Sequence, residues 1–414
     1  MTRAPWPASP AHRRWLEAET DRLLGFAPAG LTSGGFGWLD ATGRLDSSRP
    51  VELWITCRMT HVAALGHLLG RPGCRHLLEH GVGALNGPLT DRDVGGWHAA
   101  LAAGGSAPDT GLPKGAYEHA FVVLAAASAT VAGDSDGPAL LERALDALVG
   151  RFWEEEHGLV ADQWDPVTQR LDPYRGVNAN MHTLEAFLAA ADATGDRVWL
   201  ERGLRIATRV VDEFARGQGW RIPEHFDERW QPLLDYNRER PADPFRPYGA
   251  TIGHWLEWAR LCLHLRAALG AEQAPDWLLG HAGALFDAAV RDGWAVDGAD
   301  GFVYTVDWDG TPVVRERMHW VAAEATATAA ALWATTGETR YAEWYETWWS
   351  HVATAFLDLE HGSWHHELDP SLTVSETVWP GKPDLYHAVQ ATLLPRLPLS
   401  QSLAAGLAAG RLSD

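Results

Sequence analysis

The chain has 414 residues, 46 % of them hydrophobic, and a formal net charge of −20. This length and apolar content suffice for a large buried core, and no long stretch has the composition of a disordered segment. The negative charge argues against nucleic acid and against an anionic membrane surface as partners, although local arginines could still hold an anionic small substrate.

The three cysteines, Cys57, Cys74 and Cys262, show no CxxC spacing. This pattern argues against a disulfide framework or a structural zinc site and fits a reducing compartment. The N-terminal sequence MTRAPWPASPAHRRW lacks the apolar core of a signal peptide, and the longest apolar run, FVVLAAASATVAG, is far shorter than a membrane span. We therefore expect a cytoplasmic protein.

Helical periodicity dominates the chain from end to end. Apolar residues recur at i, i+3, i+4 and i+7 in Ala/Leu-rich segments. An outer helix is expected at about 11–25, followed by helices at 61–69, 116–132, 139–152, 182–193, 198–214, 252–268, 277–290, 321–335 and 340–356. Strand signals are short and lie between the helices, in GGWHAAL, HGLVADQWD, GFVYTVDWDG and HGSWHHELD. They predict small hairpins and no central sheet.

Five glycines reveal a repeat in this helical pattern. Each ends one helix and precedes a second, capped helix, as glycine commonly does beyond a helix C-terminus. They are Gly70, Gly133, Gly195, Gly270 and Gly337, which are 63, 62, 75 and 67 residues apart. Such a repeat is typical of a helical solenoid or toroid.

Pairing the outer helix at about 11–25 with a last inner helix at about 385–397 completes six helix pairs. Six pairs can close into a ring, so one domain can hold all 414 residues although the length alone suggests two or three. We predict an all-α protein with an (α/α)6 barrel, short β-hairpins in the inter-helix loops, and a single domain spanning 1–414.

Ionisable side chains recur at a similar place in the repeats. The more apolar helix of each pair precedes its glycine and should line the inside of the barrel. The residues in question lie 12 to 18 positions before their glycine, or at the start of the last inner helix: Arg58, Tyr117, His119, His182, His254, Glu257, His319, Glu324 and His387. All would then lie at one mouth of the barrel and converge on one pocket, where the helix N-termini favour partial negative charge.

This set of side chains suits proton transfer. A lone histidine on an apolar helix is more often a core residue than a catalyst, but several at matching phase are hard to explain by packing. Histidine takes up and releases protons near neutral pH, Glu257 can hold the ring of His254 three positions earlier, and Arg58 can stabilise an oxyanion. The set fits proton abstraction beside a carbonyl, as in aldose–ketose isomerisation or epimerisation.

Metal chemistry is the first alternative. His182, His254 and His387 could form a three-histidine zinc site. The chain has no HExxH motif, however, and we expect neither a metal nor a cofactor. The histidines of WHHELD and the glutamate that follows alternate faces in a predicted hairpin, so we interpret His365, His366 and Glu367 as structural or rim residues.

Carbohydrate-active proteins of other classes are the second alternative. A glycosidase or unsaturated-sugar hydrolase on the same barrel would use a pair of carboxylates, for which Glu257 and Glu324 are available. The pocket histidines would then have no role. A non-catalytic sugar-binding module would not need three histidines, although the 22 tryptophans slightly favour a carbohydrate ligand.

Four segments resemble a known family. They are NANMHTLEAFLAA (178–190), YGATIGHWLEWARL (248–261), MHWVAAEA (318–325) and GKPDLYHAVQATL (381–393). They are similar to the N-acylglucosamine 2-epimerase superfamily, and most similar to its mannose isomerase and sulfoquinovose isomerase branch. The resemblance covers essentially the whole chain and implies an (α/α)6 barrel that works without metal or nicotinamide cofactor.

The resemblance also implies roles for individual residues. His254 and His387 match the catalytic pair, in which one imidazole removes the C2 proton and a proton is delivered to C1 through a cis-enediol or enediolate. His182 matches a third pocket histidine that helps to open the ring or binds hydroxyls. The remaining implied residues are Glu257 as the acidic partner of His254, Arg58 at the substrate oxygens, Tyr117, Asn178, Trp320 and Glu324 as sugar contacts, and Arg246 as a rim contact.

The position four residues before the last histidine bears on the substrate. A sulfoquinovose isomerase is expected to place a polar residue such as glutamine there, whereas this chain has Pro383. We therefore predict a neutral hexose and an isomerase that interconverts D-mannose and D-fructose, with D-lyxose and D-xylulose as a secondary pair. Mannose 2-epimerisation to glucose is the nearest alternative, and sulfoquinovose isomerisation is another.

The remaining expectations concern partners and loops. We expect a monosaccharide substrate, no nucleic acid, no membrane, and a monomer or a homodimer. Long returns between barrel helices usually carry binding function, so 87–115 and 221–247 are candidates for a segment that covers the site.

Overall fold

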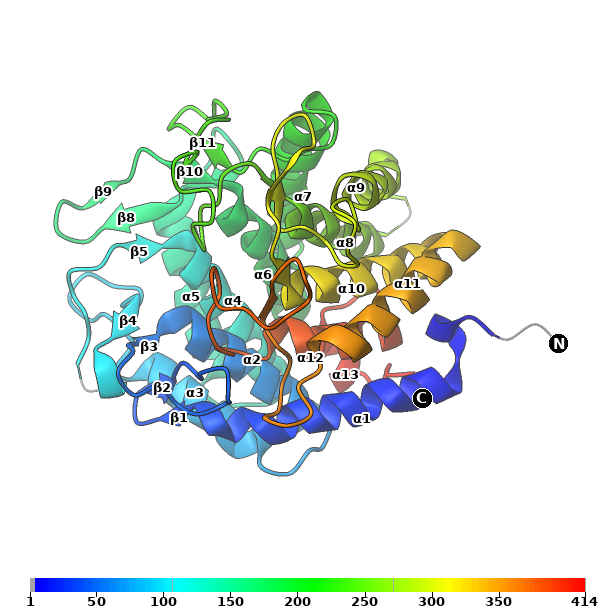
Figure 1. Cartoon of the computed structure of the whole chain (residues 1–414). Coiled ribbons are helices and arrows are strands. Elements are labelled where there is room, and N and C mark those ends of the chain that lie inside the picture. Colours follow the sequence, from blue (N-terminus) through cyan, green and yellow to red (C-terminus); the bar gives the residue numbers. More distant parts are fainter. Residues whose placement is uncertain (1–3, 106, 271, 414) are drawn as a thin grey trace.

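Six helices form a closed inner wall (Figure 1). The computed structural model describes residues 4–105, 107–270 and 272–413; residues 1–3, 106, 271 and 414 of the predicted domain lie outside these ranges. The inner helices are α2 (Leu53–Leu68), α4 (Ala116–Val131), α6 (Val177–Thr194), α8 (Ile252–Leu269), α10 (His319–Thr336) and α12 (Tyr386–Leu393). Each packs against the next in this order, and α12 packs against α2, which closes the ring.

An outer helix covers each inner helix. The outer helices are α1 (Pro10–Phe26), α3 (Cys74–Asn86), α5 (Gly137–Phe152), α7 (Val198–Ala207), α9 (Trp277–Gly293) and α11 (Thr339–His351). The first of them, α1, packs against the last inner helix, α12, and the other five pack against the inner helix that directly precedes them in the chain. The predicted (α/α)6 barrel is therefore confirmed. Two outer helices, α7 and α11, continue as the π-helices η4 (Thr208–Ala215) and η5 (Val352–Phe356).

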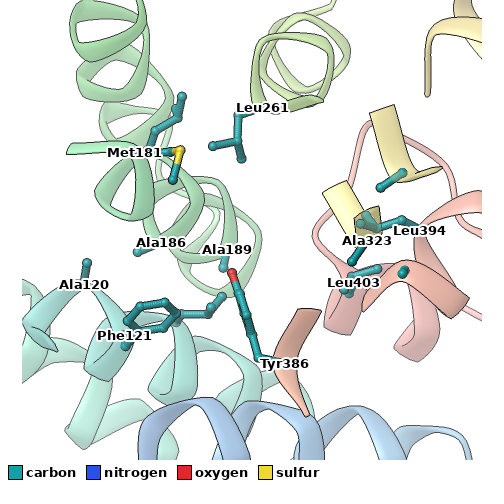
Figure 2. Close-up of a cluster of buried hydrophobic side chains, with 14 of the residues drawn as sticks. Ala120, Phe121, Met181, Ala186, Ala189, Leu261, Ala323, Tyr386, Leu394 and Leu403 are labelled. Atoms are coloured by element: carbon teal, nitrogen blue, oxygen red, sulfur yellow. The ribbon is translucent and has the colours of Figure 1, made fainter. Parts of the chain in front are cut away.

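Burial explains the difference between the two kinds of helix. Helix α2 is buried on all sides from Leu53 to Gly66, as expected for a helix enclosed by neighbours. Helix α3 buries only one stripe, which includes Leu77, Leu78, Val82 and Leu85. Small aliphatic and aromatic side chains pack between the inner helices, and Figure 2 shows the rings of Phe121 and Tyr386 near one another.

The five repeat glycines end the inner helices as predicted. Their φ angles are +71°, +78°, +72°, +86° and +72° for Gly70, Gly133, Gly195, Gly270 and Gly337. In this left-handed region glycine avoids the steric cost that a side chain would add. The prediction placed the start of α2 at residue 61, eight residues late, because WITCRMT lacks the Ala/Leu periodicity of the other inner helices.

Short strands lead into the inner helices. The strands β3 (Val51–Glu52), β5 (Lys114–Gly115), β10 (Arg175–Gly176), β12 (Ala250–Thr251) and β15 (Arg317–Met318) each end at the residue before an inner helix. Their antiparallel partners are, in the same order, β4 (Ala100–Leu101), β8 (Gln163–Asp165), β11 (His225–Phe226), β13 (Thr305–Val306) and β16 (Glu367–Leu368). The predicted strand segments are therefore present. Besides forming hairpins, they pair one inter-helix loop with the next at the mouth of the barrel.

Three hairpins complete the strand pattern: β1 (Leu31–Thr32) with β2 (Gly35–Phe36), β6 (Trp153–Glu154) with β7 (Leu159–Val160), and β8 with β9 (Arg170–Leu171). A third strand, β14 (Pro312–Val314), extends the β12–β13 pair. At the opposite end of the barrel, α13 (Leu403–Ala408) packs against α2, α4 and α6. Among the described residues, no helix has the length and apolar character that crossing a lipid bilayer would require.

Candidate active site

A pocket opens at the barrel mouth where the inner helices begin. Its empty space is about 640 Å³, including the opening to solvent. Eight of the ten residues predicted for the site line it: Arg58, Tyr117, Asn178, His182, His254, Glu257, Trp320 and His387. Convergence of these distant segments on one pocket was the main expectation from the repeat.

The lining residues occupy two layers that the helix geometry sets. The second residue of five inner helices lies in an upper layer: Trp54, Tyr117, Asn178, Trp320 and His387. In α8 the second residue is Gly253, where a Cβ would approach the ring of Trp320 to 2.3 Å. The next residue, His254, provides the side chain of the upper layer on this helix. One turn deeper, the sixth residues of α2, α6 and α8 are Arg58, His182 and Glu257. Residues four apart share a helix face, so both layers face the interior.

Each of two upper-layer histidines is anchored by a buried carboxylate. Nδ1 of His254 lies 3.0 Å from both carboxylate oxygens of Glu224. Nδ1 of His387 lies 3.0 Å from Oε1 of Glu324. A carboxylate at Nδ1 keeps the proton of the neutral ring on that atom, so Nε2 is the basic nitrogen of both rings. The indole of Trp320 contacts both rings, with ring centroids 5.3 Å from His254 and 5.6 Å from His387.

The deeper histidine is held in the same way. Nδ1 of His182 lies 3.4 Å from Oε2 of Glu185, one turn along the same helix. The hydroxyl of Tyr386 also donates to this carboxylate. Burial lowers the pKa of His182 to about 4, against the opposing effect of Glu185, so this ring is neutral at pH 7.

Arg58 places a positive charge at the pocket wall. Its NH1 donates to Oδ2 of Asp384 at 3.1 Å, and its NH2 donates to the hydroxyl of Tyr117 at 2.9 Å. The guanidinium carbon lies 4.5 Å from the ring centroid of Phe121 and 4.8 Å from that of Tyr386. Although burial alone would raise it, the pKa of Asp384 is lowered, chiefly by the charge of Arg58. Burial and the nearby Arg58 together hold the pKa of His387 well below its usual value.

Comparison with known proteins connects this geometry to a family. The family model for N-acylglucosamine 2-epimerase (GlcNAc 2-epimerase) matches residues 34–391. The chain belongs to the N-acylglucosamine 2-epimerase family. The predicted resemblance is therefore confirmed over most of the chain.

Three members of this family show how close the relationship is. A D-mannose isomerase of Thermobifida fusca is 56 % identical over 405 residues, which cover 97 % of this chain and 98 % of the relative. One from Pseudomonas cannabina pv. alisalensis is 51 % identical over 98 % of both chains. A solved structure entitled crystal structure of D-mannose isomerase superposes with a TM-score of 0.85 at 29 % identity, covering 93 % of this chain and 98 % of that one.

In this member of the N-acylglucosamine 2-epimerase family, Glu257 does not hold His254 as predicted. Glu257 lies a turn deeper, where its Oε1 is 3.9 Å from Nδ1 of His182 and 3.5 Å from NH2 of Arg260. The partner of His254 is Glu224, which comes from the loop before β11. The sequence RIPEHFD has no periodicity, so no pattern singled out Glu224. Burial, followed by repulsion from Glu324, raises the pKa of Glu257 well above its usual value.

One further expectation is corrected. Glu324 does not line the pocket; it is buried behind His387, where Oε2 accepts from Nε of Arg260 at 2.7 Å. This ion pair joins residues that are 64 positions apart, so helical periodicity could not reveal it. Arg246, expected at the rim, lines a neighbouring hollow that shares four residues with the pocket, and it donates to Asp162 at 2.8 Å.

His319, which was expected at the barrel mouth, and His366, which was interpreted as a structural or rim residue, also line the pocket. The rings of His319 and His366 stack with centroids 3.7 Å apart. In WHHELD, the adjacent Glu367 faces away and accepts hydrogen bonds from Ser375, Thr377 and the backbone of Val378 and Trp379. The predicted alternation of faces is therefore present, with His366 directed to the pocket and Glu367 to the structure of the loop.

Aromatic side chains cover the pocket. Phe245 lies with its ring centroid 5.0 Å from Trp379 and 6.2 Å from Trp54. Together with Pro244 and Pro247, it brings the predicted segment 221–247 over the pocket. No residue of the other candidate segment, 87–105 and 107–115 in the described range, lines this pocket.

Two groups of side chains have the composition of a metal site. In each, one ligand atom per residue lies within 4.8 Å of the others: His182, Glu185 and Glu257, and Glu257, Glu324 and His387. The guanidinium of Arg260 already contacts both Glu257 and Glu324. The positive charge that these carboxylates require is thus supplied by the chain itself.

Proposed function

We propose that this protein is an aldose–ketose isomerase that interconverts D-mannose and D-fructose by acid–base catalysis, without metal or cofactor. The observation that carries the proposal is the pair of imidazoles, His254 and His387, which line one pocket and both contact Trp320. Each is fixed at Nδ1 by a carboxylate, so each offers Nε2 to the substrate. The names of two relatives that are 56 % and 51 % identical over nearly the whole chain support the same activity.

The proposed reaction moves one proton between adjacent carbons. One imidazole removes the C2 proton of open-chain mannose, the C1 carbonyl oxygen gains negative charge, and a cis-enediolate forms. Arg58 stabilises this oxyanion. A proton then returns to C1, while the C2 hydroxyl loses its proton and O1 gains one, which gives the ketone and the C1 hydroxyl of fructose. The carboxylates Glu224 and Glu324 stabilise the imidazolium that forms at each ring.

The lining of the pocket supports a neutral, hydroxyl-rich ligand. Within the described residues, Asn178 Oδ1, His319 Nε2 and His366 Nε2 are buried without a hydrogen-bond partner in the protein. Sugar hydroxyls would satisfy these atoms, because buried polar groups are costly when unpaired. Neutral His182 is placed to bind a hydroxyl or to assist ring opening.

Charge argues against sulfoquinovose as the substrate. Arg58 is the single arginine or lysine among the residues that line the pocket, and Asp384 already pairs with it. Pro383 lines the pocket where a polar contact to a sulfonate was expected. A neutral hexose is therefore favoured, with D-lyxose and D-xylulose as a secondary pair.

Glycoside hydrolysis fits the pocket less well. Two carboxylate residues line it, Glu257 and Asp384, and Asp384 is engaged by Arg58 and by the backbone N–H of Tyr386. The three anchored histidines would have no part in such a reaction. Release of reducing sugar from oligosaccharides would nevertheless favour the hydrolase over the isomerase.

The decisive test uses protein treated with EDTA and incubated with D-mannose. Fructose as first product supports the proposal, glucose as first product favours the 2-epimerase, and failure to convert any aldose rejects both. In D₂O, the isomerase should place deuterium at C1 of fructose, whereas the epimerase should place it at C2 of glucose.

We further propose that residues 1–414 act as one catalytic domain in the cytoplasm, as a monomer or a homodimer with a monosaccharide as its partner. Light scattering after size-exclusion chromatography would determine the oligomeric state. A particle larger than a dimer would contradict this part of the proposal.

A further inference from the structure

Arg260 lies beneath the pocket and contacts two carboxylates that serve different histidines. Its Nε donates to Oε2 of Glu324 at 2.7 Å, while Oε1 of the same carboxylate holds Nδ1 of His387. Its NH2 lies 3.5 Å from Oε1 of Glu257. The side chain of Arg260 is 3 % exposed, and those of Glu257 and Glu324 are each 1 % exposed. One guanidinium therefore links the two deeper carboxylates in a site shielded from water.

Arg260 matters because two acidic side chains and a histidine lie close together in this buried site. The carboxylate oxygens of Glu257 and Glu324 and a ring nitrogen of His387 lie within 4.8 Å of one another. Burial and the nearby Glu324 raise the pKa of Glu257, so a second negative charge is disfavoured here, and the guanidinium of Arg260 is the cation that contacts both groups. Without it, the Glu324 side chain would lose the hydrogen bond at Oε2 that fixes its direction, and with it the means to fix the proton on Nδ1 of His387.

We propose that Arg260 is a positioning residue that holds the carboxylate of Glu324 directed at His387. It does not line the mouth pocket, so it acts on the substrate through Glu324 and His387. The kinetic part of this inference rests on the proposed isomerase function, whereas the position of the His387 proton does not depend on any activity.

A second cavity gives access to Arg260 from the other end of the barrel. Arg260 lines this cavity together with His61, Glu185, His264 and Gln390, and the segment 399–403 borders it. Within the described part of the chain, His61 Nε2, His264 Nε2 and Gln390 Oε1 are buried there without a hydrogen-bond partner. A small polar cation can therefore reach the place of a truncated Arg260 side chain without passing through the substrate pocket.

The first test is spectroscopic and independent of turnover. In protein with ¹⁵N-labelled histidine, the Nδ1–H signal of His387 is identified by its loss in His387→Asn. We expect Arg260→Met to shift or abolish this signal while circular dichroism stays unchanged. An unchanged signal in folded Arg260→Met would overturn the inference, even if wild-type protein converted no aldose and the proposed function failed.

The second test is kinetic. A displacement of about 1 Å at a catalytic group can reduce turnover by about 100-fold, so kcat of Arg260→Met should fall to that extent with little change in KM. Guanidinium chloride at tens of millimolar should restore part of the activity. Adding Ala268→Trp, which narrows the second cavity, should prevent this rescue while Ala268→Trp alone stays active. Rescue that persists in the double variant would show that guanidinium acts elsewhere and would count against the inference.

Conservative variants keep the test decisive if Arg260→Met does not fold. Lysine retains the charge but cannot contact both carboxylates as the guanidinium fork does. Arg260→Lys should therefore keep the fold and lose about tenfold in kcat, a part of the 100-fold loss. Wild-type kcat together with an unshifted His387 signal in Arg260→Lys would overturn the inference. Arg266→Met, on the same helix but lining neither cavity, serves as the matched control.

Discussion

Glu224 provides a direct test of how His254 is held, because both of its carboxylate oxygens lie 3.0 Å from Nδ1. Glu224→Gln preserves shape and removes the negative charge. The variant can still accept the Nδ1 proton, so the main loss is the stabilisation of imidazolium when His254 takes a proton. Glu224 does not line the pocket, and KM should therefore change little.

The size of the effect follows from two estimates. With charge centres about 4 Å apart and an effective dielectric constant of about 20, the carboxylate–imidazolium attraction is about 4 kcal/mol. The difference between a charge-assisted and a neutral hydrogen bond gives a lower value of about 1 kcal/mol. Since each 1.4 kcal/mol or so is a tenfold change in rate, kcat should fall by about fivefold to about 1,000-fold.

The assay is initial-rate conversion of D-mannose to D-fructose, with thermal unfolding measured in parallel. Glu228→Gln is the matched control, since Glu228 is exposed in the turn that follows β11, only four residues away. Wild-type kcat in a folded Glu224→Gln protein would refute the role assigned to the carboxylate. A rise in KM alone would show instead that Glu224 acts in binding.

Three further predictions concern the site and the fold. His254→Ala and His387→Ala should each lose nearly all turnover while unfolding near the wild-type temperature; retention of most activity by either would reject the assignment. Gly195→Ala should lower the free energy of unfolding by about 1 kcal/mol in urea titrations, because φ is +72° and no atom lies within 4 Å of the added methyl. Burial lowers the pKa of His182 to about 4, below its ordinary value of 6.5. The unfolded chain therefore binds more protons between these values, so this residue's contribution to stability is complete above pH 6.5 and is lost as the pH falls towards 4. Urea titrations at pH 7.5 and pH 5 should show the loss, and a His182→Asn variant should show a smaller one.

The architecture was predictable because it depends on patterns among residues that are close together in the sequence. Gly70, Gly133, Gly195, Gly270 and Gly337 end helices through their own backbone freedom, and apolar periodicity marks which helices are enclosed. From these features alone the six pairs and the shared mouth followed. The late start predicted for α2 shows the limit of periodicity. The segment WITCRMT is helical and fully buried, so it has no alternation of apolar and polar faces that could mark it as a helix.

The pairing inside the site was not predictable in the same way. Glu257 stands three residues from His254, and this spacing suggested a contact, but the side chain instead points one layer deeper. Glu224 reaches His254 from a loop 30 residues earlier. Asp384, Glu185 and Arg260 were likewise missed, because an ionisable residue in an apolar segment does not disclose which distant charge it faces.

The sequence by itself determined the closed ring of six helix pairs, the end of the barrel that holds the site, and three of its histidines, His182, His254 and His387. Helical phase and glycine position are properties of neighbouring residues, so a single chain records them. Only the tertiary structure decided which carboxylate holds which imidazole, that Glu324 stands behind His387 and not against the substrate, and that Arg260 links Glu257 to Glu324. Those contacts join residues from different helices and loops, and which groups pair depends on their distances and charges in the folded barrel.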